Sequence, residues 1–201
     1  DRWRRLVSSG RLELVGSAAY HAFLPFLPET EVRYQIRRQE EITAEILGVD
    51  LHGRGFFLPE MAYTPTLAKL IKAAGYRWLI LDEASLPAGM IPSTGAAYQD
   101  LNSGLSVIVR QRELSNTYIP DLIQGLLAQT SPADLLVIAT DAELYGLRHE
   151  DPTAELEKMA ELTEIKTETI SEFLNKFADL PAVSFRSASW ATDWRTDGCQ
   201  P

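Results

Sequence analysis

The sequence predicts an α/β fold organised around a parallel sheet. Two features support this prediction: short apolar runs recur along the chain, and segments with the apolar spacing of helices lie between them. Strands that alternate with helices are typical of parallel sheets, because each helix returns the chain to the edge where the next strand begins. Periodicity does not distinguish an open sheet from an incomplete barrel. Strands are expected near Leu12, Phe57, Leu79, Val107, Val137 and Ile165.

The chain begins with a polar segment that we expect to be helical and to end near Gly10. Residues 12–15 then have the apolar character of a short strand, which Gly16 closes. The segment 18–28 contains two prolines, and these exclude a regular helix or a central strand over their span. We therefore expect an ordered loop between the first strand and the next helix.

The stretch around Glu60 is the most informative part of the sequence. A surface helix is predicted over residues 29–47, and Gly48 is a suitable C-terminal stop. The apolar run of a buried strand then stops at Pro59, Glu60 follows, and residues 64–72 have helical spacing. Chemistry in an α/β barrel lies where strands end, so an acid at this junction is a candidate catalyst. An acid at a helix start is also a common capping residue.

Further apolar runs repeat the pattern of a strand that ends on charged residues. The run 76–83 ends on two acids. Residues 87–104 are rich in Pro, Gly, Ser and Asn, and we expect a long loop there. Residues 105–110 are the next expected strand, and a helix is expected to begin at Pro120.

The last third of the chain contains the clearest candidate for a buried strand, residues 135–140, which again precedes acids. A helix is expected to begin at Pro152, and residues 165–169 alternate in the manner of a short strand. Ser171 can cap a final helix, because serine is a favoured residue at helix N-termini.

Length and composition predict one domain that spans residues 1–201. The formal net charge of −9 and the lack of a basic stripe argue against nucleic acid as a partner, because phosphates require clustered Lys and Arg. The single cysteine, Cys199, cannot form an internal disulfide, which favours a cytoplasmic protein. No signal peptide or membrane span is visible, so no membrane partner is expected. The chain does not begin with Met, and we expect it to be part of a longer protein.

Several carboxylates are expected to meet on one rim of the sheet, because parallel strands deliver their carboxyl ends to the same edge. Acids that crowd together repel one another, which keeps at least one of them protonated. A protonated acid beside an ionised one can cleave a glycosidic bond, because one carboxylate attacks the anomeric carbon and the other acid protonates the leaving oxygen. The carboxylates in question are Glu60, Asp82, Glu83, Asp141 and Glu143.

Three segments also carry a family resemblance, and they occur in the expected order. They are 10–15 (GRLELV) followed by Tyr20 and His21, 57–63 (FLPEMAY) and 141–146 (DAELYG). They resemble the second, third and fourth signature regions of glycoside hydrolase family 57. Residues 112–115 and the pair Ser189 and Trp190 are also similar to that family.

This resemblance implies a distorted (β/α)7 barrel and retaining action on α-glucans, either hydrolysis or glucan transfer. By position, Glu60 matches the nucleophile and Asp141 the general acid/base. No metal or other cofactor is implied. Residues expected to contact the α-glucan are Glu13, His21, Tyr63, Asp82, Glu83, Glu143 and Trp190.

The sequence departs from the family pattern at three points. A His-Gln-Pro segment on the opening strand of the family has no counterpart, which implies that the first strand of the barrel is missing from this chain. Ala22 stands where the family usually has Pro, and Ala142 stands where Gly is common. Neither substitution removes a reacting group.

Two other hypotheses remain open at this stage. A metal-dependent polysaccharide deacetylase requires two histidines one helical turn apart and an aspartate, but His21, His52 and His149 are scattered. A non-catalytic carbohydrate-binding barrel would hold sugars with its aromatic side chains. Those aromatic residues are Tyr63, Tyr145, Trp190 and Trp194. The sequence does not distinguish hydrolysis from transfer or indicate the oligomeric state.

Overall fold

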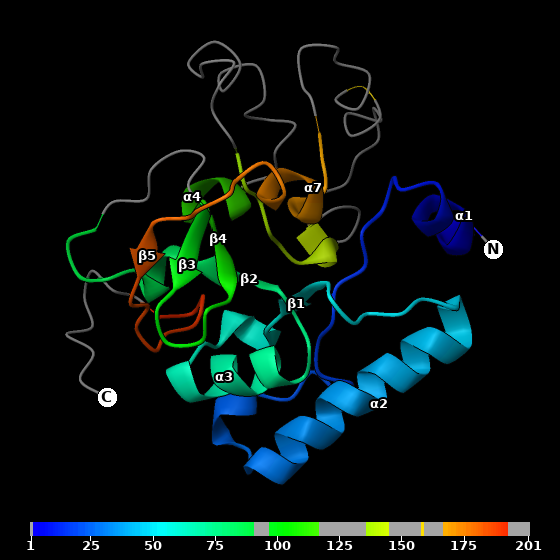
Figure 1. Ribbon diagram of the computed structural model, residues 1–201, viewed down its shortest axis with the longest axis horizontal. Helices are drawn as coiled ribbons and strands as arrows, with labels where there is room; N and C mark the ends of the chain where they lie inside the picture. Colours follow the sequence, from blue (N-terminus) through cyan, green and yellow to red (C-terminus); the bar gives the residue numbers. More distant parts are fainter. Residues whose placement is uncertain (1, 91–96, 117–135, 145–157, 159–166, 193–201) are drawn as a thin grey trace.

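The structure, a computed structural model, describes residues 2–90, 97–116, 136–144, 158 and 167–192. A five-stranded sheet lies at its centre, with the strand order β1-β2-β4-β3-β5 (Figure 1). The strands are β1 Gly55–Phe57, β2 Trp78–Asp82, β3 Ala97–Asp100, β4 Ser106–Arg110 and β5 Ala182–Val183.

Helices and short 3₁₀ turns connect the strands. The helices are α1 Arg2–Ser8, α2 Glu29–Leu47, α3 Pro65–Ala73, α4 Arg112–Ser115 and α7 Ile170–Leu174. The turns are η1 Leu24–Phe26, η2 Pro59–Met61, η3 Glu83–Ser85 and η4 Ala142–Leu144. Helix α2 has the bounds that the sequence predicted, and Gly48 ends it with a φ of 69° while its N–H donates to the Ala44 carbonyl. None of the described helices has the length and apolar character needed to cross a membrane.

The sheet is mixed, and the prediction that all strands are parallel is wrong at β3. Strands β1, β2 and β4 are parallel to one another, whereas β3 is antiparallel to β4 and parallel to β5. β3 lies within residues 87–104, where composition predicted a loop. It has no long apolar run of its own, and its place in the sheet comes from pairing with β4 and β5 on its two sides.

Alternate residues of β2 pack against the two faces of the sheet. Leu79 and Leu81 belong to the main core, which also contains apolar side chains of α2 and α3. Trp78 and Ile80 point to the other face and form a smaller cluster with Met61. Helices α2 and α3 therefore cover one face, whereas the second face is covered by helix α7 and by residues from the segments between the strands.

The strand predicted at residues 12–15 is irregular in the structure. Only the adjacent Gly16 pairs with the sheet, through an isolated parallel bridge to Phe56. The remaining predicted elements fall wholly or partly outside the described residues. They are Leu135 and Ile165 of two expected strands and the helices expected to begin at Pro120 and Pro152.

Residues 136–140 were predicted to be a buried strand, and this prediction is wrong for the described residues of that run. Their backbone bonds to side chains near α4 instead of joining the sheet ladder. The Val137 N–H donates to Gln111 Oε1 at 3.2 Å, and the Ala139 N–H donates to the Ser115 hydroxyl at 3.2 Å. The apolar composition of the run therefore reflects partial burial against the sheet face, where Val137 and Ala139 pack on the smaller cluster.

Thr169, not Ser171 as predicted, caps helix α7. The Thr169 hydroxyl accepts from the Glu172 N–H at 3.2 Å, and the Glu172 carboxylate accepts from the Thr169 N–H at 3.0 Å. The bond from the Thr169 N–H lowers the pKa of Glu172. The described part of the predicted strand 165–169, residues 167–169, leads into this cap and is not a strand.

Gly55 is required by its cross-strand partner, Trp78. A Cβ atom at Gly55 would lie 2.2 Å from the indole of Trp78. We expect Gly55→Ala to lower the free energy of unfolding by about 1–3 kcal/mol, the usual cost of overpacking a core. Urea unfolding monitored by circular dichroism measures this change.

The control is the same Gly55→Ala change in a Trp78→Leu background, where the smaller side chain leaves room for the methyl group. If Gly55→Ala costs as much there as in the natural background, contact with the indole is not the cause.

Candidate active site

Glu60 lies in a strained turn at the carboxyl end of β1. Within the turn η2, Glu60 has a φ of 57° and Met61 a φ of 47°. Positive φ is uncommon for residues other than glycine and is concentrated at functional sites. Met61 is fully buried and holds the turn in place, whereas the Glu60 side chain remains 40% exposed. The backbone therefore directs a carboxylate out of the core at the end of a strand.

Both carboxylate oxygens of Glu60 have partners from distant parts of the chain. His21 Nε2 lies 3.1 Å from Oε1, and the Trp190 indole N–H donates to Oε2 at 2.6 Å. The Trp190 backbone N–H also donates to the Glu60 carbonyl at 3.1 Å. The structure thus brings together His21, Glu60 and Trp190, which the sequence named as site residues. The carboxylate is held in one orientation while part of it still faces solvent.

Trp190 is itself held from two sides. The guanidinium carbon of Arg110 lies 5.0 Å from the centre of the indole ring, and Phe57 packs edge-on with ring centres 6.0 Å apart. One face of the indole is therefore occupied by a cation. The sugar-stacking surface that the sequence predicted for Trp190 is reduced accordingly.

Asp82, the last residue of β2, is fully buried and ion-paired with two arginines. Arg110 Nε donates to Oδ2 at 2.7 Å, and Arg112 Nη2 donates to Oδ1. The Ala84 N–H adds a bond to Oδ1 at 2.9 Å. Asp82 has no exposed surface that a substrate could contact. Its predicted role as a sugar contact is therefore not supported by this geometry.

Glu83 is partly buried and accepts from the Arg112 N–H at 3.0 Å. The carboxyl ends of β2 and β4 are thus joined by charged groups, because Asp82 and Arg110 are also paired in the sheet register. Sequence reasoning did not assign roles to Arg110 and Arg112. The signal was present, since both arginines follow an apolar strand at the same rim as the acids.

Asp141 follows a segment that is anchored at the carboxyl end of β4. Arg110, the last residue of β4, donates from Nη1 to the Ala139 carbonyl at 2.7 Å, and the Gln111 N–H donates to the Val137 carbonyl at 2.9 Å. Asp141 follows two residues later and is exposed. Glu60 and Asp141 therefore both follow anchoring points at the carboxyl ends of parallel strands.

Glu13 and Tyr63 do not reach the Glu60 carboxylate in this structure. Glu13 accepts from the Ser171 hydroxyl and, at 3.1 Å, from its N–H, and the Ser171 hydroxyl accepts from the indole of Trp78, the first residue of β2. Tyr63 is 1% exposed and donates to Asp100 at 3.0 Å. Burial raises the pKa of Tyr63, and the charge of Asp100 adds to the effect. Glu143 is exposed on the turn η4, beside Asp141.

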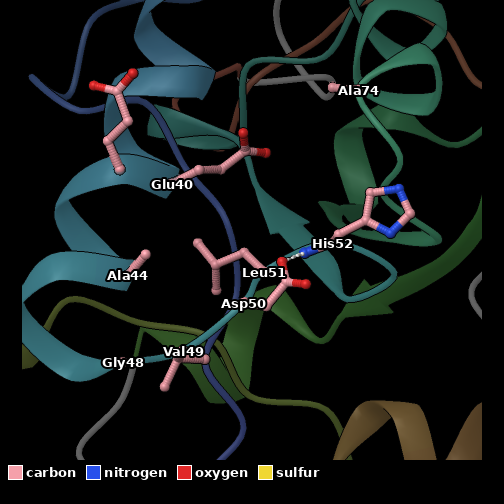
Figure 2. A pocket seen from close by; sticks show the side chains of 9 residues that line it. Glu40, Ala44, Gly48, Val49, Asp50, Leu51, His52 and Ala74 are labelled. Atoms are coloured by element: carbon pink, nitrogen blue, oxygen red, sulfur yellow. Dashed lines mark hydrogen bonds between the residues drawn. The ribbon is translucent and has the colours of Figure 1, made fainter.

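A pocket of about 570 Å³ lies elsewhere, between the end of α2 and the segment before β1 (Figure 2). Its wall includes Glu40, Glu41, Asp50 and His52, and none of the residues that hold the Glu60 carboxylate. Asp50 accepts from the His52 N–H at 2.9 Å, and Glu40 accepts from the Tyr76 hydroxyl at 2.9 Å. Glu41 accepts from Arg38 at 3.2 Å, so all three acids of this pocket already have partners within the fold.

Comparison with known protein families shows to which family the chain belongs. The sequence profile of Glycosyl hydrolase family 57 matches residues 1–184. The chain belongs to glycosyl hydrolase family 57. The resemblance inferred from short motifs is thus confirmed.

Two relatives that align with this chain are named for different activities. A 4-alpha-glucanotransferase of Thermococcus kodakarensis is 35% identical over 83 residues, which are 41% of this chain and 12% of that protein. An alpha-amylase of Pyrococcus furiosus is 34% identical over 83 residues, with the same coverage of 41% and 12%. The aligned stretch is thus a small part of the length of these relatives.

The solved 4-alpha-glucanotransferase of Thermococcus litoralis matches with a TM-score of 0.76 at 24% identity. The match covers 92% of this chain and 32% of that one. Likeness at this level of identity shows the fold. The α/β fold and the (β/α)7 barrel type predicted for family 57 are confirmed by it.

Proposed function

We propose that the protein acts on α-glucans with retention of the anomeric configuration, and that residues 1–201 belong to one catalytic barrel domain. The observation that carries this proposal is the Glu60 carboxylate, held at the strand rim by His21 and Trp190. The family supports it, because two relatives are named 4-alpha-glucanotransferase and alpha-amylase. The single cysteine of the chain further favours a cytoplasmic location.

In the first step, an oxygen of the Glu60 carboxylate attacks the anomeric carbon of the glucan. The bond from that carbon to the leaving oxygen breaks, and Asp141 donates its proton to the leaving sugar. Hydrogen bonds from Trp190 and His21 fix the carboxylate and limit the reorganisation that attack requires. The product of this step is a glycosyl-enzyme with an ester bond to Glu60.

In the second step, the ionised Asp141 removes a proton from an incoming hydroxyl group. That oxygen attacks the anomeric carbon and displaces Glu60, which returns to its carboxylate form. Water as the acceptor gives hydrolysis, and the hydroxyl group of another glucan gives transfer. Asp141 is exposed, so both kinds of acceptor can approach it.

Trapping the intermediate tests the proposal directly. Incubation with a 5-fluoro maltosyl fluoride, which forms the glycosyl-enzyme faster than water removes it, is expected to add one fluoro-maltosyl group per chain. Peptide mass spectrometry is expected to find this group on Glu60, and ¹H NMR of the product of an unmodified maltooligosaccharide is expected to show the α-anomer first.

Four results would contradict the proposal in different ways. Label on another residue removes the role of Glu60, and the β-anomer as first product indicates an inverting enzyme. Loss of activity on treatment with a chelator indicates the metal-dependent deacetylase instead. Tight glucan binding without turnover, unchanged in Glu60→Gln, indicates a carbohydrate-binding barrel.

A further inference from the structure

We propose that Arg110 is a positioning residue that holds the Glu60 segment and the Asp141 segment in one arrangement. The inference rests on the roles proposed above for these two carboxylates. The Arg110 side chain is 4% exposed and contacts Trp190, which binds Glu60, and Ala139, which lies two residues before Asp141. It therefore has no surface for substrate, and any effect on the reaction passes through its neighbours.

The first link runs through Trp190 to Glu60. The guanidinium of Arg110 lies 5.0 Å from the centre of the Trp190 ring, a distance at which a cation is attracted to an aromatic face. The same indole donates its N–H to Glu60 at 2.6 Å. A cation above the ring draws electron density from the indole, which makes this N–H a better donor to the carboxylate. Arg110 thus sets both the place of the indole and the strength of its bond.

The second link runs through Ala139 to Asp141. Arg110 Nη1 donates to the Ala139 carbonyl at 2.7 Å. Residues 136–140 are not part of the sheet, so their position depends on a few bonds from neighbours such as Gln111 and Ser115. The bond from Arg110 is the one nearest to Asp141 among these bonds.

Asp82 holds Arg110 in place for both links. Arg110 uses Nε for Asp82 and Nη1 for Ala139, while its plane faces Trp190. Arg112 donates to both oxygens of Asp82 and to the Thr192 carbonyl at 2.9 Å, two residues beyond Trp190. A planar guanidinium can serve these directions simultaneously, whereas a lysine ammonium cannot.

The test compares Arg110→Lys with Arg33→Lys, a change on the exposed surface of α2 where Arg33 pairs with Glu29. Arg110→Lys is expected to lower kcat on a maltooligosaccharide about 10²-fold, the cost of a displacement of about 1 Å in reacting groups, with KM changed little. The loss is expected to be smaller on maltosyl fluoride, whose leaving group needs no proton from Asp141. Arg33→Lys is expected to leave kcat and KM unchanged.

A spectroscopic measurement separates this inference from the proposed function. In ¹H–¹⁵N spectra, the Trp190 indole signal, assigned by its loss in Trp190→Phe, is expected to shift in Arg110→Lys and not in Arg33→Lys. Wild-type protein without turnover on α-glucans overturns the proposed function, whereas the indole shift still tests the link to Trp190. Arg110→Gln serves as a second variant, with the same expectations.

Two outcomes would overturn the inference. A folded Arg110 variant with wild-type kcat and an unshifted Trp190 signal shows that Arg110 positions neither segment. Unfolding of both variants under assay conditions shows that Arg110 serves stability alone.

Discussion

Replacing Glu60 by Gln is expected to lower turnover of α-glucans by about 10⁴-fold or more, within the range seen when a covalent nucleophile is removed. An amide cannot form the ester intermediate. It can keep bonds to His21 and Trp190, each of which contacts one carboxylate oxygen in the native protein. Initial rates on maltooligosaccharides measure the loss. The matched control is Glu45→Gln, which changes an exposed glutamate on α2 and is expected to keep full activity.

Azide distinguishes the two carboxylates. In Glu60→Ala, azide can enter the vacated space and attack the anomeric carbon directly, so the expected product is the β-glycosyl azide. In Asp141→Ala, azide attacks the glycosyl-enzyme instead, and the expected product is the α-glycosyl azide. Activity of Glu60→Gln within tenfold of wild type, or the same azide anomer from both variants, would show that the roles are assigned wrongly.

Replacing Asp82 by Asn is expected to lower the free energy of unfolding by about 3–5 kcal/mol, because it leaves two buried or half-buried guanidinium groups without their anion. Asp82 is fully buried, and the side chains of Arg110 and Arg112 are 4% and 21% exposed. Urea unfolding followed by tryptophan fluorescence measures the change.

The exposed ion pair between Glu29 and Arg33 provides the control for Asp82. Its side chains are 58% and 48% exposed, so Glu29→Gln is expected to cost about 1 kcal/mol or less. Similar losses in the two variants would mean that burial of the Asp82 cluster adds nothing to its strength.

Local rules were sufficient where an element carries its own signals. Helix α2 was predicted with its observed ends because its apolar periodicity and Gly48 both lie in the local sequence. Strands β1, β2 and β4 were predicted because each is an apolar run between turn residues. These elements depend little on distant neighbours for their identity.

Elements that depend on distant partners were missed. Strand β3 is polar at Gln99 and Asp100, and it is recruited by β4 on one side and β5 on the other. Residues 136–140 have the opposite property, because their composition is that of a strand but side chains of Gln111 and Ser115 bind their backbone. Sequence periodicity contains no information about such partners.

The candidate site shows the same division. Glu60 was predicted from a local junction of strand and acid, and family motifs supplied His21 and Trp190. Tyr63 was predicted as a sugar contact from its residue type, but its place in the core is decided by packing far along the chain. The role of Arg110 also depended on three-dimensional contacts, because its partners lie 28 to 80 residues away in sequence.

The left-handed turn at Glu60 and Met61 has a consequence for engineering this protein. Substitutions that suit positive φ, such as glycine or asparagine at position 61, would relieve the local cost of the turn. They would also remove the buried anchor that keeps the turn in place, since Met61 is fully enclosed. Loss of a buried methionine costs about 2–5 kcal/mol, which outweighs the roughly 1–3 kcal/mol that relief of the strained backbone returns. Met61 therefore serves both the thermal stability of the protein and the direction of the Glu60 side chain.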